Sequence, residues 1–102
     1  MEIIKSINDI SIRMTSERWF HIIENHDDLA GFYDEIIDTL QFPDYVIKGY
    51  KEAKIALRII RSDKFLAVVY KEVSEIDGFI ITAYFSSKIN LMEEKILWQR
   101  QS

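Results

Sequence analysis

The sequence predicts a single α+β domain over residues 1–102, in which two N-terminal helices pack on a four-stranded antiparallel sheet. Three observations lead to this fold. Apolar residues have helical spacing before Pro43, they alternate with polar residues after it, and the alternating segments are joined by short turns. Consecutive strands with short connections favour an antiparallel meander, and the two helices before it would cover one face.

The expected elements follow in order along the chain. Weak alternation up to Arg13 predicts a short strand that carries Ile10 and Ile12. Pro43 ends the helical region, because proline lacks a backbone donor and disfavours a helical conformation in the residue before it. The predicted helices span residues 17–26 and about 28–40, and the predicted strands span residues 45–48, 54–61, 65–73 and 79–86.

The first predicted helix carries both histidines of the chain. Thr15 or Ser16 offers a side-chain oxygen that can cap its first turn. At about 100° per residue, His26 falls on the apolar face with Trp19, whereas His21 falls nearly opposite. The two histidines lie roughly 140° apart around the helix, so they cannot bind one metal ion together.

Residues 88–102 fit two different structures. Leu91, Lys95 and Trp98 would share one side of a final helix. The apolar run that ends at Trp98 fits a loop followed by a short strand equally well. Both interpretations remain open from the sequence.

Composition limits the functions that the chain can have. The formal net charge is −4, with 13 Lys and Arg against 17 Asp and Glu, which counts against non-specific nucleic-acid binding but allows a small basic site. The absence of cysteine excludes disulfides, thiolate metal sites and cysteine nucleophiles. No apolar run approaches the roughly 18–20 residues that span a bilayer, and the N-terminus lacks the pattern of a signal peptide. We therefore expect a cytoplasmic protein without a metal or other cofactor.

The most regular pattern in the chain is FLAVVYKEVSEIDGFIITAYF, residues 65–85. It predicts two long strands joined around Asp77-Gly78, a favoured turn dipeptide. If Val73 pairs with Phe79, one face is almost wholly apolar and takes the helices, and the other face has a polar stripe. A slip by one residue would move part of the stripe to the opposite face. The predicted stripe consists of Tyr70, Glu72, Thr82 and Tyr84.

Each polar residue also has a structural interpretation. Tyrosine and threonine are common strand residues, so Tyr70 and Thr82 need no further role. Arg58 can pair with an acidic side chain, and His26 can be a packed or capping residue. Lys71 can be a surface lysine near a turn.

Three stretches together resemble a known superfamily: TSERWFHIIENHDDLAGFYDEI, FPDYVIKG and KFLAVVYKEVSEIDGFIITAYF. They are similar to small phage and bacterial nuclease-fold proteins of the barnase–EndoU–colicin–RelE (BECR) superfamily, and the resemblance extends from about Thr15 to about Trp98. It implies helices followed by a twisted four-stranded antiparallel sheet. It also implies metal-independent ribonuclease activity of the toxin type, with RNA as substrate and an antitoxin protein as partner.

The implied chemistry requires groups that this chain can supply. In such enzymes the ribose 2′-OH attacks the adjacent phosphorus, which calls for an acid–base pair and for groups that stabilise the phosphate. His26 is the first candidate for acid or base, and His21 is the reserve. The candidates for the phosphate and the base are Arg58, Lys48 and Lys71 as cations, Thr82 and Tyr70 as hydrogen-bond donors, and Tyr84 as a stacking ring or donor.

Two alternatives belong to other classes. The chain can be a non-catalytic module that binds a protein or peptide through the face or edge of its sheet. It can also be a homodimer sealed by Trp98 and neighbouring apolar residues.

Overall fold

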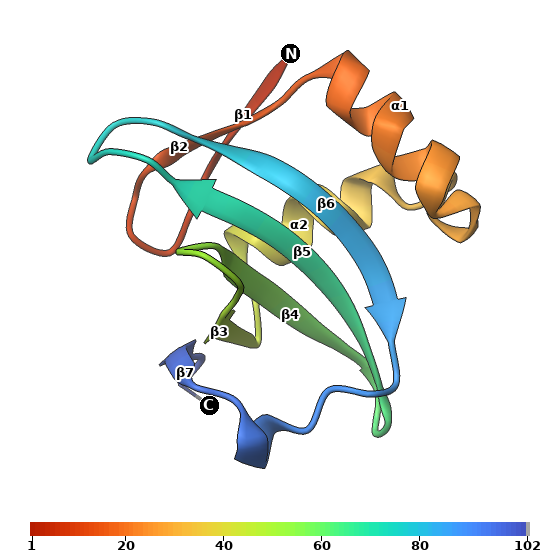
Figure 1. Ribbon diagram of the computed structural model, residues 1–102, viewed down its shortest axis with the longest axis vertical. Helices are drawn as coiled ribbons and strands as arrows, with labels where there is room; N and C mark the ends of the chain where they lie inside the picture. The colour runs from red at the N-terminus through yellow and green to blue at the C-terminus, as the bar shows by residue number, and fades with distance from the viewer. Residues whose placement is uncertain (102) are drawn as a thin grey trace.

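A seven-stranded sheet forms the centre of the protein, and it is larger than the predicted four-stranded meander (Figure 1). The computed structural model describes residues 1–101. The strand order is β1-β2-β6-β5-β4-β3-β7; β2 and β6 are parallel, and the other neighbours are antiparallel. The elements are β1 (Glu2–Lys5), β2 (Ser11–Met14), α1 (Ser16–Asn25), a 3₁₀ helix (Asp27–Leu29), α2 (Tyr33–Gln41), β3 (Tyr45–Lys48), β4 (Lys54–Arg61), β5 (Lys64–Glu72), β6 (Gly78–Ser86), a second 3₁₀ helix (Leu91–Glu93) and β7 (Ile96–Gln99).

The two helices are not N-terminal to the sheet, because a β-hairpin precedes them. The single short strand expected near Ile12 is one arm of this hairpin, and β1 is the other. Ile12 and Ile4 are both buried in the main core. Asp9 adopts a positive φ of 62° in the turn between the strands. The hairpin inserts beside β6, which turns the expected meander into a mixed sheet.

The first helix was predicted well and the second began too early. Thr15 caps α1 by accepting a hydrogen bond from the backbone N–H of Arg18 at 3.0 Å. The predicted start of the second helix at residue 28 is wrong, because a 3₁₀ turn occupies residues 27–29 and α2 begins at Tyr33. Phe32, with φ of −119°, separates the two and cannot belong to a continuous α-helix.

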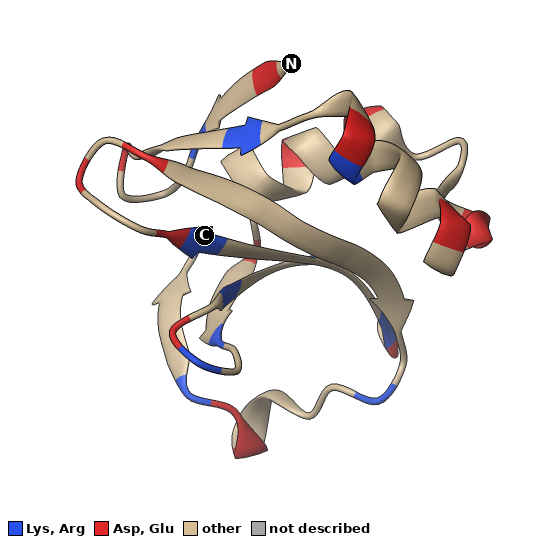
Figure 2. Ribbon diagram, turned by 45° about the horizontal axis from the view of Figure 1, so that its top comes forward, with Lys and Arg blue, Asp and Glu red and all other residues tan. Residues whose placement is uncertain are grey.

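The sheet has two different faces (Figure 2). We call the face under α1 and α2 the helix face; it carries the main core, in which Leu66, Val68 and Tyr70 of β5 are fully buried. We call the opposite face the tail face, because the tail segment, residues 87–95, runs along it (Figures 1 and 2). Ile89 and Leu91 of the tail segment pack there against a smaller buried cluster of Ile47, Leu57 and Ala67.

The C-terminal residues confirm the second of the two expected structures, a loop followed by a strand. β7 pairs with β3, with Trp98 opposite Val46. Trp98 packs against the main core on the helix face. None of the helices within residues 1–101 is long and apolar enough to cross a membrane.

Candidate functional site

A β-bulge divides the predicted polar stripe between the two faces of the sheet. Ile81 is the extra residue in β6, since the register shifts between the partners of Val69 and Tyr70. Residues directly opposite each other share a face, so Tyr70 belongs to the helix face and Thr82 to the tail face. The Cα partners are Glu72–Gly78, Lys71–Phe79 and Tyr70–Ile80 on one side of the bulge, then Val69–Thr82, Val68–Ala83 and Ala67–Tyr84 on the other.

The predicted pairing of Val73 with Phe79 is therefore wrong, because Phe79 lies opposite Lys71. Gly78 explains the error. A Cβ atom added there would lie 2.3 Å from the carbonyl oxygen of Lys71, so Gly78 permits a close approach of two strands and does not form the centre of the turn. The turn instead closes through the carbonyl of Asp77, which accepts from the N–H of Val73 at 3.0 Å.

Glu72 of β5 binds the turn of the N-terminal hairpin through side-chain hydrogen bonds on the helix face. The ammonium group of Lys54 lies 2.8 Å from Glu72 Oε1, and the side chains of Ser6 and Asn8 donate hydrogen bonds to the same carboxylate. Burial would raise the pKa of Glu72, but the bonds from Lys54, Ser6 and Asn8 outweigh burial and lower it. Only 5% of the Glu72 side chain is exposed, so this carboxylate has a structural role.

Three of the predicted site residues lie on the helix side of the sheet, away from His26. Tyr70 is fully buried, and its hydroxyl has no hydrogen-bond partner within residues 1–101. The pKa of this hydroxyl is raised, mainly by burial and to a smaller extent by the nearby charge of Glu72. Arg58 lies 4.0 Å from Asp38 of α2, and Lys48 shares the helix side of β3 with buried Val46. None of the three can meet a substrate together with His26.

His26 meets Tyr84 at the edge of the tail face. His26 follows the last residue of α1, and its ring centroid lies 6.1 Å from that of Tyr84 with an interplanar angle of 37°. Thr82 precedes Tyr84 by two residues in β6 and projects to the same face. The pKa of Tyr84 is raised, mainly by burial and to a smaller extent by the charge of Glu94 in the tail segment. The hydroxyl of Tyr84 therefore stays protonated at neutral pH and can donate a hydrogen bond.

His21 does not join this pair. It is exposed on α1 and lines a shallow surface depression together with Glu17, Arg18 and Glu24. The structure therefore separates the two histidines, as the helical spacing predicted. An acid–base pair made of His21 and His26 cannot form around one phosphate.

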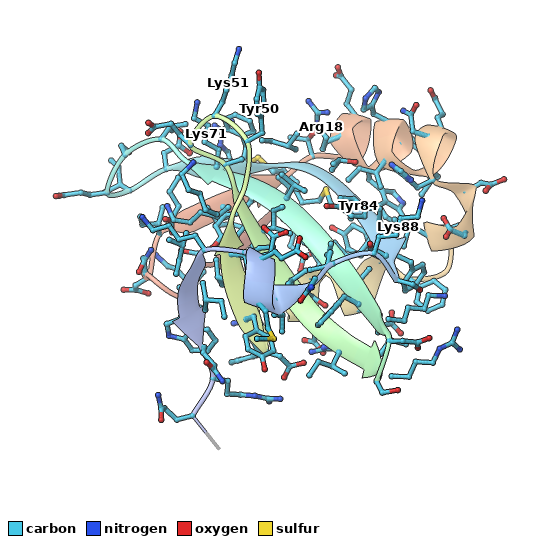
Figure 3. All side chains as sticks on the ribbon, turned by 60° about the horizontal axis from the view of Figure 1, so that its bottom comes forward. Arg18, Tyr50, Lys51, Lys71, Tyr84 and Lys88 are labelled. Carbon is cyan, nitrogen blue, oxygen red and sulfur yellow. The ribbon has the colours of Figure 1, made fainter. Side chains whose placement is uncertain are left out.

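Basic and aromatic side chains gather on the tail face and around its rim (Figure 3). Arg18 of α1 donates from Nη1 to the carbonyl oxygen of Ile81 at 3.1 Å, which places its guanidinium at the bulge. Lys71 belongs to the tail face of β5, opposite Phe79. Figure 3 shows the labelled residues toward one side of this view, with Lys71 near the Tyr50–Lys51 turn and Lys88 near Tyr84.

Sequence analysis missed four of these residues: Arg18, Tyr50, Lys51 and Lys88. A usable signal existed in the turn between β3 and β4, where an aromatic residue and a lysine follow Gly49 at a tight connection. No signal was available for Arg18, since a basic residue in the first turn of a helix suggests only an exposed position. Its role depends on the bulge, which the sequence does not reveal.

No family model, curated protein or solved structure matches the chain. Functional assignment therefore depends on the residues themselves. Within residues 1–101, no three His, Asp or Glu side chains come together as a metal site. The residues best suited to catalysis or ligand binding lie together on the tail face. They are His26, Thr82 and Tyr84, with Arg18, Lys71 and Lys88 as the nearby cations.

Proposed function

We propose that the chain is a metal-independent endoribonuclease of the toxin type that binds RNA on the tail face and cleaves it beside His26. The contact between His26 and Tyr84 carries this proposal, because it joins a proton-transfer group to a hydrogen-bond donor at a partly exposed edge. The resemblance to BECR nucleases, which rests on sequence stretches that include both residues, is part of the same proposal.

The reaction is a transfer within the substrate. The neutral imidazole of His26 takes the proton of a ribose 2′-OH while that oxygen forms a bond to the adjacent phosphorus. The bond from phosphorus to the 5′-oxygen of the next nucleotide breaks, and that oxygen takes a proton from solvent. The products are a 2′,3′-cyclic phosphate and a 5′-hydroxyl, and histidine suits the first step because it titrates near neutral pH.

Tyr84 and Thr82 stabilise the charge that develops on the phosphate, and Arg18, about 12 Å along the helix from His26 at about 1.5 Å per residue, binds a neighbouring phosphate of the RNA. The hydroxyl groups of Tyr84 and Thr82 donate to the phosphate oxygens, which are more negative in the transition state. Arg18 donates a hydrogen bond from Nη1 to the carbonyl oxygen of Ile81, and its remaining N–H groups are free to bind phosphate. Arg58 and Tyr70, on the other side of the sheet, have no part in this chemistry.

The acidic overall charge is compatible with a local RNA site. The acidic first turn of α2, with Asp34 and Glu35, belongs to the helix layer on the far side of the sheet. The tail face has basic residues at several points of its rim, beside the acidic Glu94 near Tyr84 and Asp27 and Asp28 directly after His26. Such a distribution favours binding of a specific or short RNA over coating of any polyanion.

A cleavage assay with a matched pair of histidine variants tests the proposal. Wild type and His21→Ala should cleave single-stranded RNA in the presence of EDTA and leave a 2′,3′-cyclic phosphate. His26→Ala should lower the rate by about 100-fold or more, the range for loss of a general base. A wild type that cleaves no RNA, or equal rates for both variants, would overturn the proposal.

The toxin assignment has its own test in cells. Production of the wild-type chain in the cytoplasm should stop growth, and His26→Ala should relieve this effect at the same protein level. An antitoxin partner would be encoded next to the gene and should restore growth when both are produced. Growth that is unaffected by wild type would contradict the toxin assignment without excluding RNA cleavage in the purified protein.

A second candidate function is protein binding through the free edge of β7. Ile96 and Leu97 are each 41% exposed on this edge strand, and exposed apolar strand edges favour pairing with another chain. Trp98, expected to seal a homodimer, packs inward and is unsuited to that role. Leu97→Lys should leave RNA cleavage unchanged and should abolish any dimer seen by light scattering; a dimer that persists would contradict this use of the edge.

A further inference from the structure

The turn between β3 and β4 presents an exposed aromatic ring. Tyr50 is 82% exposed. The turn itself is tightly closed, because the N–H of Ala53 donates to the carbonyl of Tyr50 at 3.1 Å and the N–H of Gly49 donates to the carbonyl of Ala53 at 2.8 Å. At this exposure the ring contributes little to the packing of the protein and is accessible to a ligand.

The backbone of this turn is strained. Lys51 and Glu52 both have positive φ, 47° and 69°, at two consecutive positions where a hairpin turn usually has Asn-Gly. Strain of this kind persists where the surrounding structure enforces it, and it concentrates at ligand-binding segments. The ammonium group of Lys51 lies 5.5 Å from the centroid of the Tyr50 ring, so the turn presents a cation beside an aromatic surface.

The turn lies at one end of the proposed RNA site. Lys54, the first residue of β4, pairs with Tyr70 of β5, so the turn before it lies beside Lys71. Lys71 is four residues along β5 from Ala67, the partner of Tyr84. This separation is about 13 Å along the strand, at about 3.3 Å per residue.

We infer that the β3–β4 turn is a second RNA contact, in which Tyr50 stacks on an unpaired base and Lys51 and Lys71 bind flanking phosphates. This inference rests on the proposed ribonuclease function and defines its substrate class as single-stranded RNA that continues beyond the cleavage site toward the β3–β4 turn. Stacking needs a free base face, which a duplex does not offer. Glu52 is the acidic group in the turn itself, and it weakens the phosphate contact.

Binding of single-stranded RNA tests the inference. In a His26→Ala background, which prevents cleavage, the affinity for a labelled RNA of about 12 nucleotides is measured by fluorescence anisotropy. Tyr50→Ala should weaken binding by about fivefold or more, the lower end for loss of one base stack, and Tyr50→Phe should stay within about twofold. Phe42→Ala is the matched control, since Phe42 is also exposed but lies at the C-terminal end of α2.

Variants of the charged residues test the phosphate contacts. Lys51→Asn retains a residue that tolerates positive φ, so the turn survives while one cation is lost. The slope of log affinity against log salt concentration should fall by about 0.7 for each phosphate contact removed, in Lys51→Asn and again in Lys71→Gln. Glu52→Gln should tighten binding, and an RNA duplex of the same length should compete poorly.

The outcomes separate this inference from the proposed function. If wild type binds and cleaves RNA, and Tyr50→Ala binds as tightly as Phe42→Ala, the turn is not an RNA contact and only this inference fails. If wild type neither binds nor cleaves RNA, the proposed function and this inference fail together. Equal affinity for single-stranded and duplex RNA would also contradict stacking on Tyr50. Circular dichroism spectra confirm that each variant is folded.

Discussion

Arg18 donates a hydrogen bond to the carbonyl oxygen of Ile81, and Ile81 is the residue that β6 inserts at its bulge. A bulge leaves its extra residue outside the strand ladder, so a side chain from α1 supplies the missing partner. The same bulge places Thr82 and Tyr84 on the tail face. One side chain therefore links the helix that carries His26 to the strand that carries Tyr84.

Removal of this link should destabilise the protein. We expect Arg18→Met to lower the free energy of unfolding by about 1.5–3 kcal/mol, the range for a hydrogen bond to a charged group, as measured by urea denaturation. Arg61→Met is the matched control, because Arg61 pairs with Asp63 only at the exposed β4–β5 turn, where ion pairs contribute about 0–1 kcal/mol. Equal losses in both variants would mean that the bond to Ile81 contributes nothing specific.

Tyr84 should contribute to RNA cleavage through its hydroxyl group. Tyr84→Phe keeps the ring contact with His26 and removes one donor to the phosphate, so kcat should fall by about 100-fold, as for loss of a single transition-state donor. Tyr45→Phe is the control, because Tyr45 packs against the same apolar cluster on the tail face. Cleavage by Tyr84→Phe at the wild-type rate would restrict Tyr84 to a stacking role.

The environment of Glu72 predicts a pH dependence of stability. Its pKa in the folded protein is below the ordinary value of 4.5, so its stabilising effect is complete above about pH 4.5 and is lost as the pH falls through the folded pKa. Glu72→Gln should be less stable at pH 7 by about 1–3 kcal/mol, and the difference from wild type should shrink in acid. Glu75→Gln, at an exposed position in the β5–β6 turn, should leave the pH profile unchanged.

The buried hydroxyl of Tyr70 predicts a stabilising substitution. It has no partner within residues 1–101, and an unsatisfied buried polar group costs about 1–3 kcal/mol. Tyr70→Phe should therefore unfold at a higher urea concentration than wild type. Tyr33→Phe should not, because the hydroxyl of Tyr33 donates to Glu2 at 2.8 Å and would lose that bond. A lower stability of Tyr70→Phe would indicate a buried water at this position.

Local patterns predicted the elements whose structure depends on local sequence. The bounds of β3 and β4 follow from alternation between Pro43 and the polar turn after Arg61, and they agree with the structure. The start of α1 follows from its threonine cap, which is also a local interaction. The second helix failed because a 3₁₀ turn with a buried Leu29 has the same apolar spacing as a helical turn.

The candidate site was only partly predictable, because it depends on long-range contacts. His26, Thr82, Tyr84 and Lys71 were named from the sequence, and the structure places Thr82, Tyr84 and Lys71 on the tail face, with His26 at its edge. The prediction for Tyr70 was wrong because β6 inserts one extra residue, Ile81. A shift of one position reverses the direction of every side chain beyond it, so Tyr70 lies on the helix face. The strand at Ile12 was predicted. Strand β1 and the pairing of the hairpin with β6 were missed, because β1 has only four residues and β6 lies far along the chain.

The tail segment also has a consequence for how the protein forms during synthesis. β3 ends at Lys48, and its second neighbour, β7, begins at Ile96, so on the ribosome β3 remains a sheet edge until nearly all of these residues have emerged. Ile89 and Leu91 reach the tail face equally late and close its apolar cluster. A nascent chain therefore exposes Ile47, Leu57 and Ala67 until the tail segment has emerged. A partner protein that recognises this surface can bind the chain before β7 completes the sheet.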